Sequence, residues 1–378
     1  MKHFSMRLSA AALLTTLALT TPAQAAQVQI SGMIDSYLEA YTAGNTTVTR
    51  LSSGGANGGS RVTFSGTEEM DGGLTAFFRL EMGILNDEGI STGNNPNYLF
   101  ERETVVGVRG NFGSISFGRQ YTPHFMSLPM NEPTGQSLGG AIGAFGVPGH
   151  VSTNGIGLSS GGAPLATTRM DNSLVYSTPT VAGLTTTFMA AFGEQTYQDN
   201  GVEKPSNARG NFYNLGFRYV NGPFTSNLSF AKWNNPKIGA KTLDDVWFES
   251  FSAAYDFNVT KLNVIVTARQ SDDIEVPNLW ATELGSLTPM LGGALAVTVG
   301  YLTNCDQDKG DALSWGIRYD YPLSKSTKVY AGVFGVQNED NAKFVLAGGG
   351  GSSMPPAFAK EETGLANNTV FIGLNHRF

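Results

Sequence analysis

The sequence ends in Thr369-Val-Phe-Ile-Gly-Leu-Asn-His-Arg-Phe378, where apolar and polar residues alternate up to the last position. Val370, Ile372 and Leu374 share one face with the terminal Phe378, and Thr369, Asn375 and Arg377 lie on the other. A period of two predicts a β-strand with one apolar and one wet face. A terminal aromatic suits the aromatic girdle of a membrane β-barrel, although the edge strand of a secreted β-sandwich has the same local pattern.

The N-terminus predicts a cleavable export signal over residues 1–25. Lys2 and Arg7 form a basic start, a short apolar run follows, and Ala23-Gln24-Ala25 is a small-x-small cleavage site. The apolar run is too short for a spanning helix, and no other uncharged stretch approaches that length. A place in a membrane would therefore require a closed barrel, in which every backbone group finds a partner.

The composition narrows the classes of function and site. The single cysteine, Cys305, excludes an intramolecular disulfide framework and a cysteine-based metal site. Without Lys2 and Arg7, 22 basic residues (24 − 2) stand against 31 acidic ones, and a net charge of −9 argues against nucleic acid as a partner. Acidic loop pairs such as Asp272-Asp273 are better explained as solvated loops than as Ca²⁺ sites, so we expect no metal and no cofactor.

From Gln27 onward, strand-like runs alternate with turns that are short, then long, then short. The runs number about sixteen, an even number that is typical of single-chain barrels. The predicted runs start near Gln27, Arg61, Leu74, Glu101, Ser114, Asp171, Leu184, Asn211, Phe224, Val246, Lys261, Leu279, Leu295, Ala312, Lys328 and Thr369. Tight turns such as Asn221-Gly-Pro223 at one end and long polar connections at the other favour an outer-membrane barrel.

The chain contains no linker that would divide it, so residues 26–378 are predicted to form one barrel domain. Aromatic residues such as Tyr219, Tyr319 and Tyr321 lie at strand ends beside turns, as a membrane girdle requires. This placement favours an all-β transmembrane antiparallel barrel over a sandwich.

The connection Tyr121–Thr168 is the longest and is rich in small residues. It contains one acidic residue, Glu132, and no Lys or Arg. Because loops of this length are usually functional, we expect it to fold inward and narrow the barrel, the alternative being a disordered external loop.

Basic residues near this loop have the phase of a lumen-facing side chain. Arg61 and Arg79 alternate with apolar neighbours, Arg119 and Arg169 lie at strand edges, and Arg102 fits the phase least well. Clustered arginines in a pore create a local positive potential. Glu81, Asp35 and Glu39 are the acidic residues predicted to face the same lumen.

Four runs carry a resemblance to a known family. Gly59–Glu81, Gly107–Tyr121, Arg169–Pro179 and Val370–Phe378 resemble the trimeric general-diffusion porins of Gram-negative outer membranes, closest to the β-proteobacterial branch. The resemblance implies a sixteen-stranded barrel with short periplasmic turns, long external loops and a third loop folded into the lumen. It also implies a homotrimer in the outer membrane, in contact with lipid and lipopolysaccharide, that passes ions and small hydrophilic solutes.

By the same resemblance, the pore constriction falls on Arg61, Arg102 and Arg169, with Arg119 nearby, facing Glu132 on the loop. Many members of the family carry several acids on this loop, whereas this chain supplies one. We therefore expect weak anion preference or near-neutral selectivity.

Other functions fit the sequence less well. A substrate-selective channel for small anionic metabolites is the nearest alternative, and a secreted adhesin is a more distant one. A hydrolase needs a nucleophile with a positioned histidine, and none of His3, His124, His150 and His376 lies in a supporting motif. We expect no enzyme activity and no catalytic residue.

Overall fold

The structure is a computed structural model. It describes residues 27–53, 56–92, 99–135, 168–199, 202–206, 208–238, 241–273, 276–344, 346 and 363–378. The predicted export signal and residues 136–167 of the long third connection lie outside these ranges.

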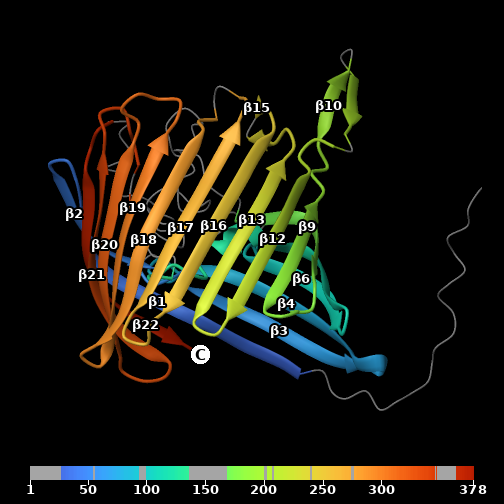
Figure 1. The fold of residues 1–378 in the computed structure, drawn as a ribbon, viewed down its shortest axis with the longest axis horizontal. Coiled ribbons are helices and arrows are strands. Elements are labelled where there is room, and N and C mark those ends of the chain that lie inside the picture. Colours follow the sequence, from blue (N-terminus) through green and yellow to red (C-terminus); the bar gives the residue numbers. More distant parts are fainter. Residues whose placement is uncertain are drawn as a thin grey trace, which may run out of the picture.

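Sixteen antiparallel strands form a closed barrel (Figure 1), which confirms the predicted fold class. In chain order they are β1 (Gln27–Ala43), β3 (Arg61–Met70), β4 (Leu74–Leu85), β6 (Glu103–Gly110), β7 (Gly113–Tyr121), β8 (Arg169–Ser177), β9 (Leu184–Ala191), β12 (Phe212–Asn221), β13 (Phe224–Trp233), β16 (Val246–Asp256), β17 (Lys261–Ser271), β18 (Leu279–Met290), β19 (Gly293–Asn304), β20 (Ala312–Pro322), β21 (Thr327–Asn338) and β22 (Asn367–Arg377). Each observed start lies within two residues of the predicted one; the start of β6, for example, is Glu103 where Glu101 was expected.

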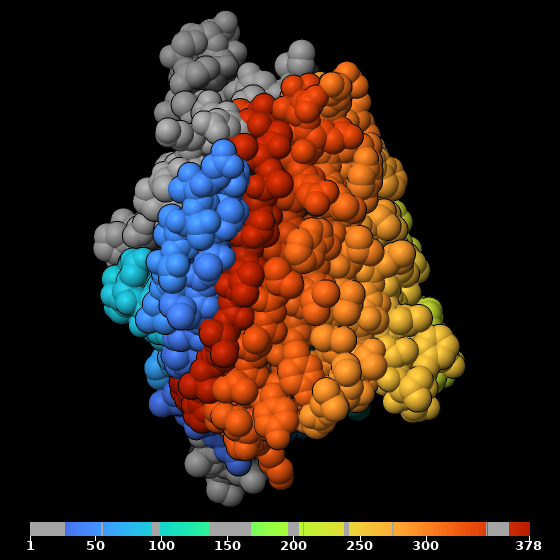
Figure 2. Space-filling model, turned by 90° about the vertical axis from the view of Figure 1, so that its left-hand side faces the viewer, coloured from blue at the N-terminus to red at the C-terminus, as the bar shows by residue number. Residues whose placement is uncertain are grey.

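The first and last strands close the barrel. β1 pairs with β22 from Met33 opposite Arg377 to Ala43 opposite Asn367, and its first half pairs with β3. Figure 2 shows the blue N-terminal strand running beside the red C-terminal strand along the height of the molecule. Closure leaves no free strand edge in the barrel, as a membrane requires.

The two ends of the barrel differ, as the sequence predicted. Short turns join the strands at the lower end of Figure 1, and the long connections lie at the upper end. The upper end carries the small strands β2 (Thr46–Ser53) and β15 (Lys241–Thr242), and the hairpin of β10 (Thr196–Asp199) and β11 (Val202–Pro205) rises above it. The small strand β14 (Lys237–Ile238) pairs with β15, and β5 (Ile90–Ser91) pairs with the last residues of β4. The short helices are η1 (Asp71–Gly73) and α1 (Pro123–Ser127), and no helix among the described residues has the length and apolar character to cross a membrane.

The outer face is apolar and the inner face is polar. In β22, Val370 and Ile372 are 58% and 61% exposed on the outside, whereas Thr369 and Asn375 are 0% and 1% exposed inside. The inner residues are covered although they are polar, because they hydrogen-bond to inward side chains of the neighbouring strand: Thr369 donates to Glu39, and Asn375 donates to Asp35. The alternation in the sequence therefore reports the lipid side and the filled side of one wall.

The last long connection contributes to this filling. Its residues Ala342, Phe344 and Leu346 are buried and pack against strand residues that include Tyr41 and Phe371. The side chain of Asn338 donates to the carbonyl of Phe344 at 2.7 Å, and Asn367 donates to the same carbonyl at 2.9 Å. The sequence pattern predicts an external loop for this connection, residues 338–368; its described part instead turns into the mouth of the barrel.

Candidate pore constriction

The third connection enters the barrel directly after β7. Thr122 caps α1 by accepting a hydrogen bond from the Phe125 amide at 3.0 Å, and Pro123 follows at the first helical position. Residues 122–135 then run along the inner wall, which confirms that the described part of this loop is folded into the lumen.

Mostly uncharged side chains on the wall hold this loop through a row of hydrogen bonds. The His124 amide donates to Asn214 on β12 at 2.6 Å, and Ser127 meets Ser250 on β16 at 2.6 Å. Asn131 donates to Ser252 on the same strand at 3.0 Å. Further along, Arg318 on β20 donates to the carbonyl of Thr134 at 2.7 Å. We call the neutral residues Asn214, Ser250 and Ser252 the docking wall.

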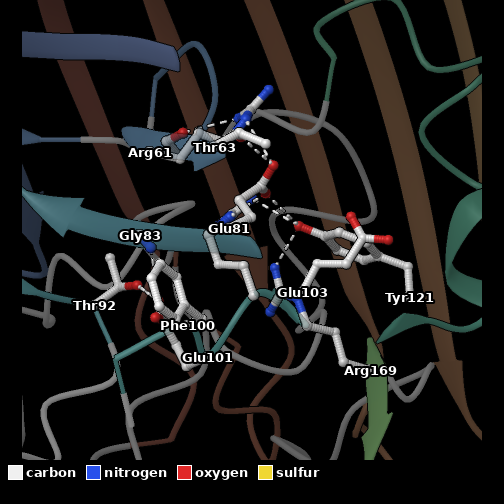
Figure 3. A network of polar contacts seen from close by, with 12 residues as sticks. Arg61, Thr63, Glu81, Gly83, Thr92, Phe100, Glu101, Glu103, Tyr121 and Arg169 are labelled. Atoms are coloured by element: carbon white, nitrogen blue, oxygen red, sulfur yellow. Dashed lines mark hydrogen bonds and ion pairs between the residues drawn. The ribbon is translucent and has the colours of Figure 1, made fainter. Parts of the chain in front are cut away.

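A cluster of arginines lies on another part of the wall, around Glu81 of β4 (Figure 3). Glu81 is 2% exposed and accepts from Arg102 at 2.8 Å and from Arg79 at 2.5 Å. Arg61 approaches the same carboxylate at 3.9 Å, and Thr63 donates to it at 2.9 Å. The carboxylate therefore holds several guanidinium groups close together that would otherwise repel one another.

Tyr121 joins Arg169 to this group. Its hydroxyl accepts from Arg102 at 2.8 Å and from Arg169 at 2.7 Å, and the Arg169 guanidinium lies 4.3 Å from the centre of its ring. The ring also stacks on Phe125 of the inserted loop, with 5.5 Å between the ring centres. We call Arg61, Arg79, Arg102 and Arg169, with Glu81 and Tyr121, the arginine wall.

The charge on this wall is positive. Arg61, Arg79 and Arg102 contact two carboxylates, Glu81 and Glu103, the latter 2.7 Å from Arg79. Arg169 joins them through the hydroxyl of Tyr121, so the four guanidinium groups and two carboxylates give a balance of 4 − 2 = +2. The wall therefore attracts anions at the level where the third loop fills part of the lumen.

The structure brings three of the predicted constriction arginines together and separates Arg119 from them. Arg119 pairs with Asp171 at 2.6 Å and donates to the carbonyl of Glu101 at 2.5 Å. The physical reason is a bulge between Gly118 and Gln120 that shifts the register of β7 against β8. Gly118 has φ +125°, and a Cβ there would lie 2.0 Å from the carbonyl oxygen of Thr104, so this conformation requires glycine.

Glu132 lies on the inserted loop as expected, but its carboxylate forms hydrogen bonds within that loop. It is 6% exposed and accepts from the amide and the hydroxyl of Thr134 at 2.8 and 2.5 Å. The ion pairs of the arginine wall run to Glu81 and Glu103 instead.

Asp35 and Glu39 face inward from β1 but are covered. Asp35 accepts from Tyr330 and from Asn375, both at 3.0 Å. Glu39 pairs with Arg50 at 2.6 Å and accepts from Thr369 at 2.9 Å. Both side chains lie on the side of the barrel that the last connection fills, so they support the wall and do not line open water.

The sequence interpretation missed Tyr121 as a site residue. In the sequence it is marked only by being an aromatic residue at the end of a predicted strand, directly before the long loop. Its role depends on Arg102 and Arg169, which reach it from elsewhere in the chain.

Comparison with known proteins agrees with this architecture. Residues 10–341 match the family model described as Gram-negative porin. Outer membrane porin protein 32 of Delftia acidovorans is 28% identical over 97% of this chain and 99% of its own length. A second outer membrane porin protein, from Bordetella pertussis, is 29% identical over 58% of this chain and 54% of its own length.

A solved structure, the anion-selective porin from Comamonas acidovorans, has the same fold, with a TM-score of 0.75 and 24% identity over 94% of this chain and 100% of that one. The family match covers most of the sequence, and the closed barrel with its inserted third loop agrees with it. The chain therefore belongs to the Gram-negative porin family and is a passive-diffusion channel of the outer membrane.

Proposed function

We propose that this porin is a weakly anion-preferring channel for ions and small hydrophilic solutes. The observation that carries the proposal is the arginine wall, where four guanidinium groups gather around two carboxylates and the Tyr121 hydroxyl beside the inserted loop. A charge at a narrow point enclosed by low-dielectric walls acts on every ion that passes.

The overall negative charge does not oppose this preference. The sequence without residues 1–25 carries −9, but many of its acids belong to the long connections. Exposed charges there are screened within about 8 Å at physiological salt, so they act weakly on an ion inside the barrel. The name of the similar Comamonas structure, an anion-selective porin, adds support.

The test is the reversal potential of the purified protein in a planar bilayer under a KCl gradient. The unaltered channel should give the sign of an anion-preferring pore. The double variant Arg61→Gln/Arg169→Gln should shift that potential toward cations, whereas Arg119→Gln, outside the wall, serves as the matched control. A strongly cation-selective unaltered channel would contradict the proposal.

We also propose that residues 1–25 are removed on export and that residues 26–378 assemble as a homotrimer in contact with lipid and lipopolysaccharide. Apolar side chains of β1 and β22 are exposed on the outside, among them Ile30 at 59% and Leu38 at 51%. Such a face fits either lipid or a second subunit. Light scattering in mild detergent should give the mass of three chains, and a monomer would contradict this assembly.

The proposal assigns no catalytic residue. His124 is buried among the contacts of the inserted loop, and His376 lies beside Thr327 at 2.9 Å near the short turns. The ring of His124 also lies 3.4 Å from the Ser250 hydroxyl, but both side chains are buried where the inserted loop meets the wall, so this contact serves packing and not nucleophilic catalysis.

A substrate-selective channel for small anionic metabolites is the second candidate. It would need a binding group beside the arginine wall, and one cavity of the structure bears on this point.

A further inference from the structure

A cavity of about 230 Å³ lies between the inserted loop and the inner wall. The loop contributes Pro123, Met126 and Met130, and the wall contributes Val175 and Thr187. Met130 is 43% exposed although it lies inside the barrel, where the neighbouring strands present mostly polar side chains. An apolar patch that remains open within a polar lumen is a candidate site for an apolar group of a passing solute.

The charges around the cavity are positive. Arg218 of β12 lines it and is exposed, and none of the described carboxylates forms an ion pair with it. Tyr121 also lines the cavity and carries Arg169 over its ring. The lining residues include no Asp or Glu.

We propose that this cavity is a subsite for small aromatic monocarboxylates. The aromatic ring lies against Met126, Met130 and Val175, and the carboxylate faces Arg218. Thioether side chains adapt to flat rings of different substitution, and a guanidinium binds a carboxylate through paired hydrogen bonds. The inference deepens the proposed anion preference and rests on it, because the solute must first pass as an anion.

The size of the cavity limits the solute. Pockets for drug-sized ligands begin at roughly 300 Å³, so a cavity of about 230 Å³ suits a single ring with a short acidic group. Binding must remain weak, because a solute that stays in the lumen blocks the channel that carries it.

Three probes test the proposal in planar bilayers: benzoate, acetate and benzyl alcohol, each measured by the concentration that halves the KCl current. Acetate has the charge without the ring, and benzyl alcohol has the ring without the charge. We expect benzoate to act at a concentration about tenfold lower than either, as partial burial of a ring predicts. Equal potency of benzoate and acetate, or of benzoate and benzyl alcohol, would overturn the proposal.

Two variants localise the effect. Met130→Gln keeps the length of the side chain but removes its apolar end. We expect benzoate and acetate then to halve the KCl current at nearly equal concentrations, a ratio close to one. Arg218→Gln should weaken benzoate without changing benzyl alcohol. Met290→Gln, the same change at an exposed methionine at the end of β18, is the matched control and should keep the ratio of the unaltered channel. If Met130→Gln left the ratio of the benzoate and acetate concentrations unchanged, the assignment of the subsite to this cavity would be overturned.

The reversal potential in KCl, measured in the same membranes, separates the two proposals. Cation preference of the unaltered channel would contradict the proposed function. Anion preference without a benzoate effect would contradict only the subsite.

Discussion

The arginine wall and the docking wall are two parts of one barrel that solve different problems. The arginine wall, on β3, β4 and the strand ends beside them, concentrates charge around one buried carboxylate. The docking wall, on β12 and β16, uses only neutral amide and hydroxyl groups and binds the inserted loop. Charge gathers on one part of the inner wall, whereas the inserted loop is held mostly by neutral hydrogen bonds, with Arg318 as the charged exception.

The difference follows from the cost of burial. A neutral hydrogen bond between two buried groups stabilises by about 1 kcal/mol and leaves no charge without water. A buried ion pair must overcome the desolvation of both ions, so it suits a wall that still borders water. Arg79 and Arg61, with side chains 41% and 32% exposed, retain such contact, whereas Glu81 at their centre does not.

The largest expected effect concerns Gly118, at the bulge of β7 that precedes Tyr121 of the arginine wall. Gly118→Ala places a Cβ 2.0 Å from the carbonyl oxygen of Thr104 at φ +125°, so β7 must move and carry Tyr121 with it. A strained backbone of this kind costs about 1–3 kcal/mol before the clash is counted. We expect a several-fold loss of folded barrel, measured by heat-modifiable migration on gels.

The control for this change is Gly72→Ala. Gly72 also has a positive φ, +76°, but nothing lies within 4 Å of the added Cβ. Gly72→Ala should lower the free energy of unfolding by about 1 kcal/mol, the cost of placing a side chain on a backbone with positive φ. Equal losses for both variants would show that the contact with Thr104 does not matter.

The second prediction concerns a variant that removes hydrogen bonds between the docking wall and the inserted loop. The double variant Asn214→Leu/Ser250→Val removes the partner of the His124 amide and one of the two partners of Ser127, whose hydroxyl also donates to the carbonyl of His124 at 2.6 Å. A buried amide left without a partner costs about 1–3 kcal/mol, and together with the lost Ser127–Ser250 bond this should let the loop leave the wall part of the time. We expect larger or fluctuating single-channel conductance.

Thr282→Val is the matched control, because Thr282 is exposed on the outer face of β18. Steady, unchanged conductance in the double variant would mean that other contacts suffice to hold the loop.

The third prediction sharpens the role of charge on the arginine wall. Glu81→Gln removes one negative charge, so the local balance rises from +2 to +3. The reversal potential in a KCl gradient should move further toward anions, opposite in sign to the shift for Arg61→Gln/Arg169→Gln. Glu283→Gln, a buried inner carboxylate on β18, tests whether any lumen acid has this effect. A shift toward cations for Glu81→Gln would contradict the assignment.

The smallest effect is expected at Glu132. Its carboxylate is turned toward Thr134 of its own loop, so Glu132→Gln should change the reversal potential much less than Glu81→Gln does. A shift of equal size in the same gradient would place Glu132 among the controlling charges.

The sequence by itself determined the strands, the turns and the side of the wall on which each strand residue lies. These features depend on neighbours two to four positions away: the alternation in β22, or the Gly and Pro of the turn after Asn221. It also placed arginines at inward phases, because phase is a local property once a strand is recognised.

Only the tertiary structure decided which of these residues meet. Arg102 and Arg169 share the hydroxyl of Tyr121, although 67 positions (169 − 102) separate them in the chain. The bulge at Gly118 moves Arg119 away from the cluster, and the carbonyl of Thr104 on the neighbouring strand leaves room there only for glycine. Asp35 and Glu39 share the parity of lumen-lining residues, yet they are covered because partners more than 290 positions away pack over them. Contacts across a closed barrel have no local signature, since they arise only when the register of every strand is fixed at once.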